Sequence, residues 1–327
     1  MRRREFITTL GVAAATAAWP LAARAQQAAK ALQVGFLYPG PQAGAVPRMA
    51  AYLSGLQAGG FRAEQFTLIP RVTGGNSTLL APMAAELVAS NVNLITAIGP
   101  AAVRTAQTAT NVIPIVAIDL ESDPVSSGFV ASIARPGGNI TGVFLDFPDF
   151  STKWLEALKE GVPQLSNVAV LWDPATGPTQ RNALDVAAKA LGLSLTILEV
   201  RERADFATAF QSATQQRIGG AVILSSPLVG ANTKLLAELA EKHRLPAVTL
   251  FSEFARAGGL MAYGPNLLGI FRQCGVISAK ILRGAKPAEL PIEAPSKFEF
   301  VLNLKAAHLL ELAMPASILL RADEVIE

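Results

Sequence analysis

Acidic, hydroxyl and aromatic side chains follow the predicted strands of this chain at the points where those strands end. In open α/β sheets, ligands bind at the carboxyl ends of the strands. Each of these side chains alone is also ordinary turn or helix-cap chemistry. Six such strand ends facing one cleft favour a shared binding site. The candidate site residues are Tyr38, Gly99, Pro100, Ala101, Asp119, Glu121, Asp123, Asp173, Thr176, Ser225, Ser226, Phe251, Glu253 and Tyr263.

The acids among these candidates are compatible with three kinds of chemistry. Asp119, Glu121, Asp123 and Glu253 could pair with an amino group of a ligand, pair with an arginine of an opposite lobe, or act as a general acid and base. The residue types alone leave all three open. The free N–H groups of the helix that starts after Gly99 could hold a carboxylate, and the aromatic candidates could form an apolar wall.

Motifs for common catalytic and cofactor sites are absent from the sequence. His243 and His308 lie far apart, without the spacing of a zinc site. There is no G-x-S-x-G nucleophile motif, no G-x-x-x-x-G-K-[ST] phosphate loop, and no dinucleotide-binding G-x-G-x-x-G. Cys274 is the only cysteine, so we expect a small buried hydrophobe and no intramolecular disulfide. We therefore expect no catalytic residue, no metal and no cofactor.

Short apolar runs alternate with helix-forming stretches along the chain. Phe206, Ala209, Phe210 and Ala213 have the spacing of one buried helix face, and Gly192 predicts the end of the preceding helix. Strands that are apolar throughout are typical of parallel sheets covered by helices on both faces, so we predict an α/β fold with doubly wound parallel sheets. Strands are predicted at 34–38, 66–69, 94–98, 115–118, 168–172, 195–198, 221–224, 247–250, 260–263 and 298–302, and helices at 46–58, 79–90, 101–110, 152–161, 179–191, 205–216, 230–244 and 271–282.

These elements form two successive sets, which predict two lobes. Strand and helix material remains after the second set, so the lobes are expected to be interleaved, with the chain crossing between them three times. The predicted crossings are 139–147, 252–259 and 293–298, and they divide the chain into a first lobe of residues 32–142 plus 260–294 and a second lobe of residues 143–258 plus 296–327.

Residues 1–25 have the three parts of a removable export signal. Arg3-Arg4 stands before an apolar pair, which indicates the twin-arginine route. The apolar stretch at 7–21 is shorter than the roughly 20 residues of a membrane-spanning helix. Ala23-Arg24-Ala25 fits the small-x-small rule for signal peptidase. We expect cleavage near Ala25, a periplasmic location and no stable membrane insertion afterwards.

The positive charge of the full chain belongs largely to this signal. The chain has 28 Lys and Arg against 25 Asp and Glu, and the signal contains four arginines and one glutamate. The mature chain therefore has 24 basic and 24 acidic residues. A balanced charge gives no reason to expect nucleic-acid binding. We expect a monomer of roughly two ordinary domains.

Several segments, in order and across essentially the whole mature chain, resemble one known family. The sequence is similar to ABC-transporter substrate-binding proteins, in a subgroup related to tryptophan/tyrosine-binding proteins. The segments that carry the resemblance are Asp119–Val125, Gly128–Ser132, Arg135–Gly142, Ala257–Gly264, Ile281–Pro287, Phe298–Lys305 and Leu320–Glu327.

This resemblance implies a type I periplasmic-binding-protein fold with a ligand at the interface of two lobes. It also implies an ABC permease and its ATPase as partners. We expect a receptor that captures a small molecule, such as an amino acid or another small carboxylate, by hinge closure. An amino acid would place its carboxylate near Pro100 and its amino group on Asp123 or Glu253. The alternatives are an exported sensory module, or a hydrolase that uses the acidic cluster.

Overall fold

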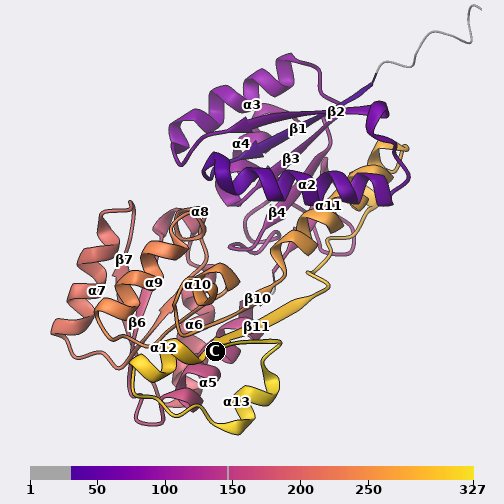
Figure 1. Ribbon diagram of the computed structural model, residues 1–327. Coiled ribbons are helices and arrows are strands. Elements are labelled where there is room, and N and C mark those ends of the chain that lie inside the picture. Colours follow the sequence, from indigo (N-terminus) through magenta and orange to yellow (C-terminus); the bar gives the residue numbers. More distant parts are fainter. Residues whose placement is uncertain (1–30, 146) are drawn as a thin grey trace, which may run out of the picture.

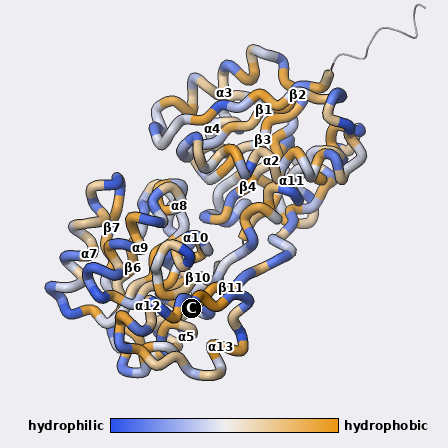
Figure 2. The backbone as a smooth tube through the Cα atoms, in the orientation of Figure 1, coloured by the Kyte–Doolittle hydropathy of each residue, from blue (hydrophilic) through white to orange (hydrophobic). Residues whose placement is uncertain are grey.

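The chain folds into two α/β lobes, each built on its own sheet (Figure 1). The computed structural model describes residues 31–145 and 147–327, so the predicted export signal at 1–25 lies outside the described residues. Figure 2 shows hydrophobic residues along the strands inside the lobes and hydrophilic residues on outer helices such as α7 and α9. No helix in the described ranges is long and apolar enough to cross a membrane.

The first lobe contains a parallel five-stranded sheet in the order β2-β1-β3-β4-β5. Phe36 packs against Tyr52 on the face covered by α2 and α11, whereas Leu37 joins the core beneath α3 and α4 on the other face. The elements are β1 (Leu32–Tyr38), α2 (Gln42–Ala58), η1 (Ala63–Gln65), β2 (Phe66–Val72), η2 (Ser77–Leu79), α3 (Leu80–Ala89), β3 (Leu94–Ile98), α4 (Pro100–Ala109), β4 (Ile115–Asp119), β5 (Ile140–Phe144), α11 (Leu267–Leu282) and η4 (Pro287–Glu289).

The second lobe contains a seven-stranded sheet in the order β12-β11-β10-β9-β8-β6-β7, in which only β10 and β11 pair antiparallel. Helices α5 and α6 form one layer, and α7, α9 and α10 form the other. The elements are α5 (Phe147–Gly161), β6 (Asn167–Trp172), η3 (Pro174–Thr176), α6 (Thr179–Leu191), β7 (Ser194–Glu199), α7 (Asp205–Gln215), β8 (Gly220–Ile223), α8 (Pro227–Gly230), α9 (Thr233–Lys242), β9 (Ala247–Thr249), α10 (Ser252–Arg256), β10 (Met261–Pro265), β11 (Phe298–Asn303), α12 (Leu304–Leu309), α13 (Ala316–Arg321) and β12 (Glu324–Ile326).

Local sequence signals explain these elements. The stripe of Phe206, Ala209, Phe210 and Ala213 is buried in α7, and Gly192 ends α6 in the left-handed conformation, with φ 67°. All five residues of β3 are buried, as a central strand covered by helices on both faces requires. The prediction of doubly wound α/β lobes is therefore confirmed.

The chain crosses between the lobes three times: between β5 and α5, between β10 and α11, and before β11.

Two predicted boundaries are wrong. Ile140–Phe144 lies inside the first predicted crossing, yet its buried apolar side chains add strand β5 to the first sheet. Met261–Pro265 was assigned to the first lobe, but it pairs with β9 and β11 in the second sheet. The second crossing follows Pro265, because Ser252–Arg256 folds as α10 against that sheet.

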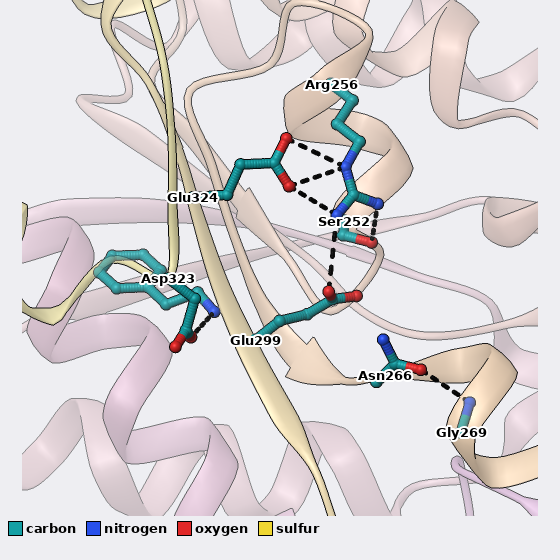
Figure 3. Close-up of polar contacts among 8 residues, drawn as sticks. Ser252, Arg256, Asn266, Gly269, Glu299, Asp323 and Glu324 are labelled. Carbon is teal, nitrogen blue, oxygen red and sulfur yellow. Dashed lines mark hydrogen bonds and ion pairs between the residues drawn. The ribbon is translucent and has the colours of Figure 1, made fainter.

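Hydrogen bonds hold the chain on either side of these crossings. The side chain of Asn266 accepts a hydrogen bond from the Gly269 N–H at 2.7 Å and caps the start of α11 (Figure 3). The Trp154 indole N–H donates to the carbonyl of Tyr263 at 2.6 Å. The Phe144 N–H donates to the carbonyl of Glu293 at 3.0 Å. These hydrogen bonds fix the chain close to each crossing. The segments that connect the lobes are therefore short.

The C-terminal strand is held to the second lobe by Arg256. Its guanidinium donates to the Glu324 carboxylate at 2.7 Å and to the Ser252 hydroxyl at 2.9 Å, and it lies 3.5 Å from Glu299 (Figure 3). The Asp323 carboxylate accepts a hydrogen bond from the Phe300 N–H at 2.8 Å. Because Arg256 is half-exposed, these ion pairs position β12 more than they stabilise the fold.

Helices α2 and α11 pack closely because glycines face each other across the contact. A Cβ on Gly55 would overlap the carbonyl of Arg272, and a Cβ on Gly275 would overlap the carbonyl of Tyr52. Beside this contact, the Tyr52 hydroxyl donates to Ser278 at 2.7 Å and accepts from Thr96 at 2.9 Å. Helix α11 arrives from the second lobe, so this contact completes the first lobe with a distant part of the chain.

We predict that Gly275→Ala destabilises the protein by about 1–3 kcal/mol, because the added methyl forces α2 and α11 apart. Urea unfolding, monitored by circular dichroism, measures the difference. The matched control is Gly138→Ala, because a Cβ there meets no atom within 4 Å and the backbone does not have positive φ. Equal stability of the two variants would show that the helix contact tolerates a methyl group.

Candidate functional site

Two connected cavities lie between the lobes, at the carboxyl ends of both sheets. The inner cavity, of about 60 Å³, is lined mainly by apolar and aromatic side chains. The outer cavity, of about 500 Å³, is more polar. Pro39, Ile98, Gly99 and Pro227 line both, so the two cavities meet at these residues. Gly99 has φ +79°, and a Cβ there would lie 3.3 Å from Cγ of Pro227 on the opposite lobe.

The first lobe supplies most of the inner wall. Tyr38 ends β1, and the guanidinium of Arg48 lies 5.8 Å from the centroid of its ring. Burial raises the pKa of Tyr38, so it is a neutral wall residue. The remaining inner-wall residues of this lobe are Pro39, Ile98, Gly99, Ile118, Leu120, Glu121, Leu267, Ile270 and Phe271.

The acidic cluster after β4 divides into two structural roles. Asp119 is fully buried and accepts hydrogen bonds from the N–H groups of Glu121 at 2.9 Å and Ser122 at 3.1 Å, and from the Ser122 hydroxyl. Asp123 accepts from the Ser126 N–H at 2.6 Å. Both carboxylates therefore stabilise turns, and neither lines either cavity. Glu121 is the member of the cluster that lines the inner cavity.

Glu121 contacts the second lobe directly. Its Oε1 accepts a hydrogen bond from the hydroxyl of Ser225 at 2.6 Å. Burial raises the pKa of Glu121 to about 8, and the charge of Asp119 contributes in the same direction. Burial also raises the pKa of Asp119, although its hydrogen-bond donors oppose that effect. The pair is therefore poised to share one negative charge near neutral pH.

The second lobe contributes four of the expected polar residues. Ser226 lines the inner cavity, and its hydroxyl accepts from the Val229 N–H at 3.1 Å, which caps α8. Asp173 and Thr176 line the outer cavity. Asp173 accepts from the Ala175 N–H at 2.9 Å, and burial raises its pKa. Ser225 lies behind Ser226, is 1% exposed and lines neither cavity, but it is the residue that reaches Glu121.

The predicted aromatic wall is only partly at the cavities. Tyr38 and Phe251 line the inner cavity from opposite lobes, and Gly230 packs against the Phe251 ring. Tyr263 lies elsewhere, stacked on Phe150 with ring centroids 5.3 Å apart, and lines neither cavity. Strand β10 continues to Pro265, so Tyr263 lies inside the strand and not at the strand end expected from the sequence.

Glu253 is placed at the edge of the interface. Its side chain is 47% exposed and lies 4.0 Å from Arg48 of the first lobe, so it forms an interlobe ion pair. Pairing with an arginine of the opposite lobe is one of the three roles that the sequence left open for the acids. Glu253 lines neither cavity.

The outer cavity contains two further residues expected from the sequence, and it adds others that were not among the candidates. Pro100 and Ala101 line it at the start of α4, where Gly99 provides no side-chain cap. Gly74 and Gly75 follow β2, and Arg201, Glu202 and Arg203 follow β7. Both groups come after strand ends, so the same carboxyl-end rule identifies them once these strands are placed correctly. Within the described ranges, no three His, Cys, Asp or Glu side chains form a metal-binding group.

Known proteins share this architecture. Residues 49–326 match the family model for ABC transporter substrate binding protein. The tyrosine-binding protein of Clostridioides difficile is 23% identical over 250 residues, which cover 74% of this chain and 70% of that protein.

Among solved structures, an ABC domain from Streptococcus pneumoniae in complex with L-Trp superimposes with a TM-score of 0.84 at 22% identity, covering 91% of this chain and all of that one. The ligand-free, open structure of a substrate-binding protein with adhesive properties from Clostridium difficile gives 0.66 at 20% identity, covering 90% and 99%. These matches establish the type I periplasmic-binding-protein fold predicted from the sequence, and the family match covers most of the chain: this protein belongs to the ABC transporter substrate-binding protein family.

Proposed function

We propose that this protein is a periplasmic solute receptor of an ABC importer, and that it captures one small molecule between its lobes. The observation that carries this proposal is the pair of connected cavities at facing strand ends, with walls supplied by both lobes. The receptor is exported through the twin-arginine signal at 1–25, acts as a monomer by binding without turnover, and delivers its ligand to a permease driven by an ATPase.

An amino acid with an aromatic side chain is the ligand class that the cavities and the relatives together favour. The inner cavity presents the aromatic rings of Tyr38, Phe251 and Phe271 and several aliphatic side chains. The outer cavity presents charged and polar groups at its mouth. An aromatic amino acid is divided in the same way as the cavities, because it has an apolar side chain at one end and a zwitterion at the other. Of the three similar proteins named above, one is a tyrosine-binding protein and one is in complex with L-Trp.

The zwitterion fits the outer cavity. The first turn of α4 opens onto this cavity without a side-chain cap, so its N–H groups are available for the carboxylate, as expected from Pro100. The amino group pairs with Asp173 rather than with Asp123 or Glu253, because Asp173 alone among these three lines the outer cavity. Arg201 and Arg203 add positive charge at the mouth.

The lobes must separate to admit this ligand. The inner cavity, of about 60 Å³, is much smaller than the outer cavity of about 500 Å³, and both lobes supply its walls. An aromatic ring therefore enters only when the facing walls move apart. The short connections at the three crossings allow such a hinge motion, and closure then removes the ligand from water.

We predict that an aromatic amino acid raises the melting temperature of the mature protein. At 100 times the dissociation constant, one bound ligand adds about 2.7 kcal/mol of stability, which amounts to several degrees. A thermal-shift screen against tyrosine, tryptophan, aliphatic amino acids, sugars and nucleosides measures this effect. A shift with sugars alone would contradict the ligand class, and no shift with any small solute would contradict the receptor.

We predict that Asp173→Asn weakens binding of the best amino acid by tenfold or more, about 1.4 kcal/mol, because the ammonium loses its charged partner. Asparagine keeps the side-chain oxygen that accepts from Ala175, so the turn at η3 is preserved. Isothermal titration calorimetry measures the affinity. Asp185→Asn, in α6 and outside both cavities, is the matched control. Equal affinity of the two variants would refute this placement of the amino group.

A further inference from the structure

A buried hydrogen bond joins the two lobes at the base of the inner cavity. Ser225, which follows β8 of the second lobe, donates from its hydroxyl to Glu121, which follows β4 of the first lobe, at 2.6 Å. Glu121 is 5% exposed and Ser225 is 1% exposed. When the lobes separate, this bond must break, and the Glu121 carboxyl faces the opened, water-filled cleft.

Both partners of this bond are held rigidly within their own lobes. The side chain of Gln180, itself fully buried, accepts from the Ser225 N–H and donates to the Ser225 carbonyl, both at 2.8 Å. On the other side, the Leu120 N–H donates to Glu121 at 3.3 Å, and the Glu121 carboxyl is hydrogen-bonded to that of Asp119. The distance between Glu121 and Ser225 therefore reports the position of the lobes rather than local side-chain motion.

The surroundings of Glu121 disfavour its negative charge in the closed cleft. No Lys, Arg or His within the described part of the chain forms an ion pair with it. Arg48 lines the same cavity, but its guanidinium donates to the Gly44 carbonyl and pairs with Glu253. Helix α11 contributes only apolar side chains to this wall.

The other titratable groups near this wall do not supply a positive charge either. Tyr38 is neutral, and Asp173 on the second lobe is another acid. Asp119 accepts three hydrogen bonds from N–H and O–H donors, so it is the member of the carboxyl pair that holds the negative charge. Glu121 then takes the proton, which it donates to Asp119 while it accepts from Ser225.

We propose that Glu121 is a proton-dependent latch: its protonated carboxyl bridges Asp119 and Ser225 and holds the lobes closed, and its ionisation favours the open form. Glu121 is thus a positioning residue for the hinge motion proposed above. A glutamine at this position keeps the two bonds of the latch, because its amide donates to Asp119 and accepts from Ser225 without titrating, and it loses only the long 3.3 Å bond from the Leu120 N–H.

The direction of the pH effect follows from the two states of the cleft. Burial raises the pKa of Glu121 to about 8 in the closed form, whereas water in the open cleft returns it toward its ordinary value. The closed form therefore binds more protons. Closure is fully favoured below the open-state pKa, and it weakens by up to about tenfold per pH unit as the pH rises toward about 8. Above that pH, the equilibrium no longer changes.

Small-angle X-ray scattering on the ligand-free mature protein, between pH 5 and pH 9, tests the latch. We expect the radius of gyration to increase with pH as the lobes open. In Glu121→Gln, it should stay at the low-pH value throughout. In Ser225→Ala, which removes the hydroxyl donor, it should be larger at low pH than in the native protein. Glu253→Gln is the matched control, because it removes an exposed interlobe ion pair and should keep the native pH dependence.

A constant radius of gyration in the native protein, or the same pH dependence in Glu121→Gln, would overturn the proposal. Circular dichroism at each pH confirms that the variants are folded. This experiment uses no ligand, so its outcome is separate from the thermal-shift screen. If the radius of gyration depends on pH but no solute raises the melting temperature, the latch is supported and the receptor function is contradicted. If a solute raises the melting temperature but the radius of gyration is independent of pH, the receptor function is supported and the latch is contradicted.

Discussion

The burial of polar strand ends between two lobes is the constraint on which the other features depend. Parallel sheets bring their carboxyl ends to one edge, and here two such edges face each other and are largely withdrawn from water. Buried polar groups must find hydrogen-bond partners, because each unsatisfied group costs free energy. Asp119 and Ser226 meet this requirement by capping the turn and the helix that follow their own strands, and the partly buried Asp123 caps a turn in the same way. The groups left to act across the interface are few, and they include Glu121 and the uncapped start of α4.

The apolar end of the cleft is continuous with the hydrophobic core of the protein. Tyr38, Ile98 and Phe271 line the inner cavity and also belong to the core cluster that reaches from the first lobe into the second. The same side chains therefore stabilise the fold and shape the cavity. Polarity increases toward the mouth, where the loops after β2 and β7 approach each other. This gradient orients any ligand that has one apolar and one charged end.

The alternation of apolar strands and amphipathic helices made the fold predictable, and the carboxyl-end rule located the cleft. The individual roles of the candidates were harder to predict, because an acid after a strand can cap a turn or face a ligand with the same sequence pattern. Asp119 and Asp123 are examples of the first outcome, whereas Glu121 lines the inner cavity and bonds to Ser225 of the opposite lobe.

Other residues escaped prediction for reasons of strand placement and tertiary contact. Pro70 interrupts the apolar run of β2, so the strand was ended too early and Gly74 was overlooked. The sequence places Tyr263 at a strand end, but β10 continues to Pro265, and the Tyr263 ring stacks on Phe150. Arg48 lies in α2 with no local signal, and its ion-pair partner Glu253 comes from the second lobe.

The path of α11 also has a consequence for the order in which the protein can form. The glycine-lined face of α2 is covered by residues 267–282, which are synthesised more than 200 residues after α2. The first lobe therefore cannot acquire its complete core while the chain is still being elongated through the second lobe. The second sheet likewise includes β12, which ends at Ile326, so nearly the whole polypeptide contributes before both lobes are complete. The proposed twin-arginine export suits such a chain, because that route can carry folded proteins.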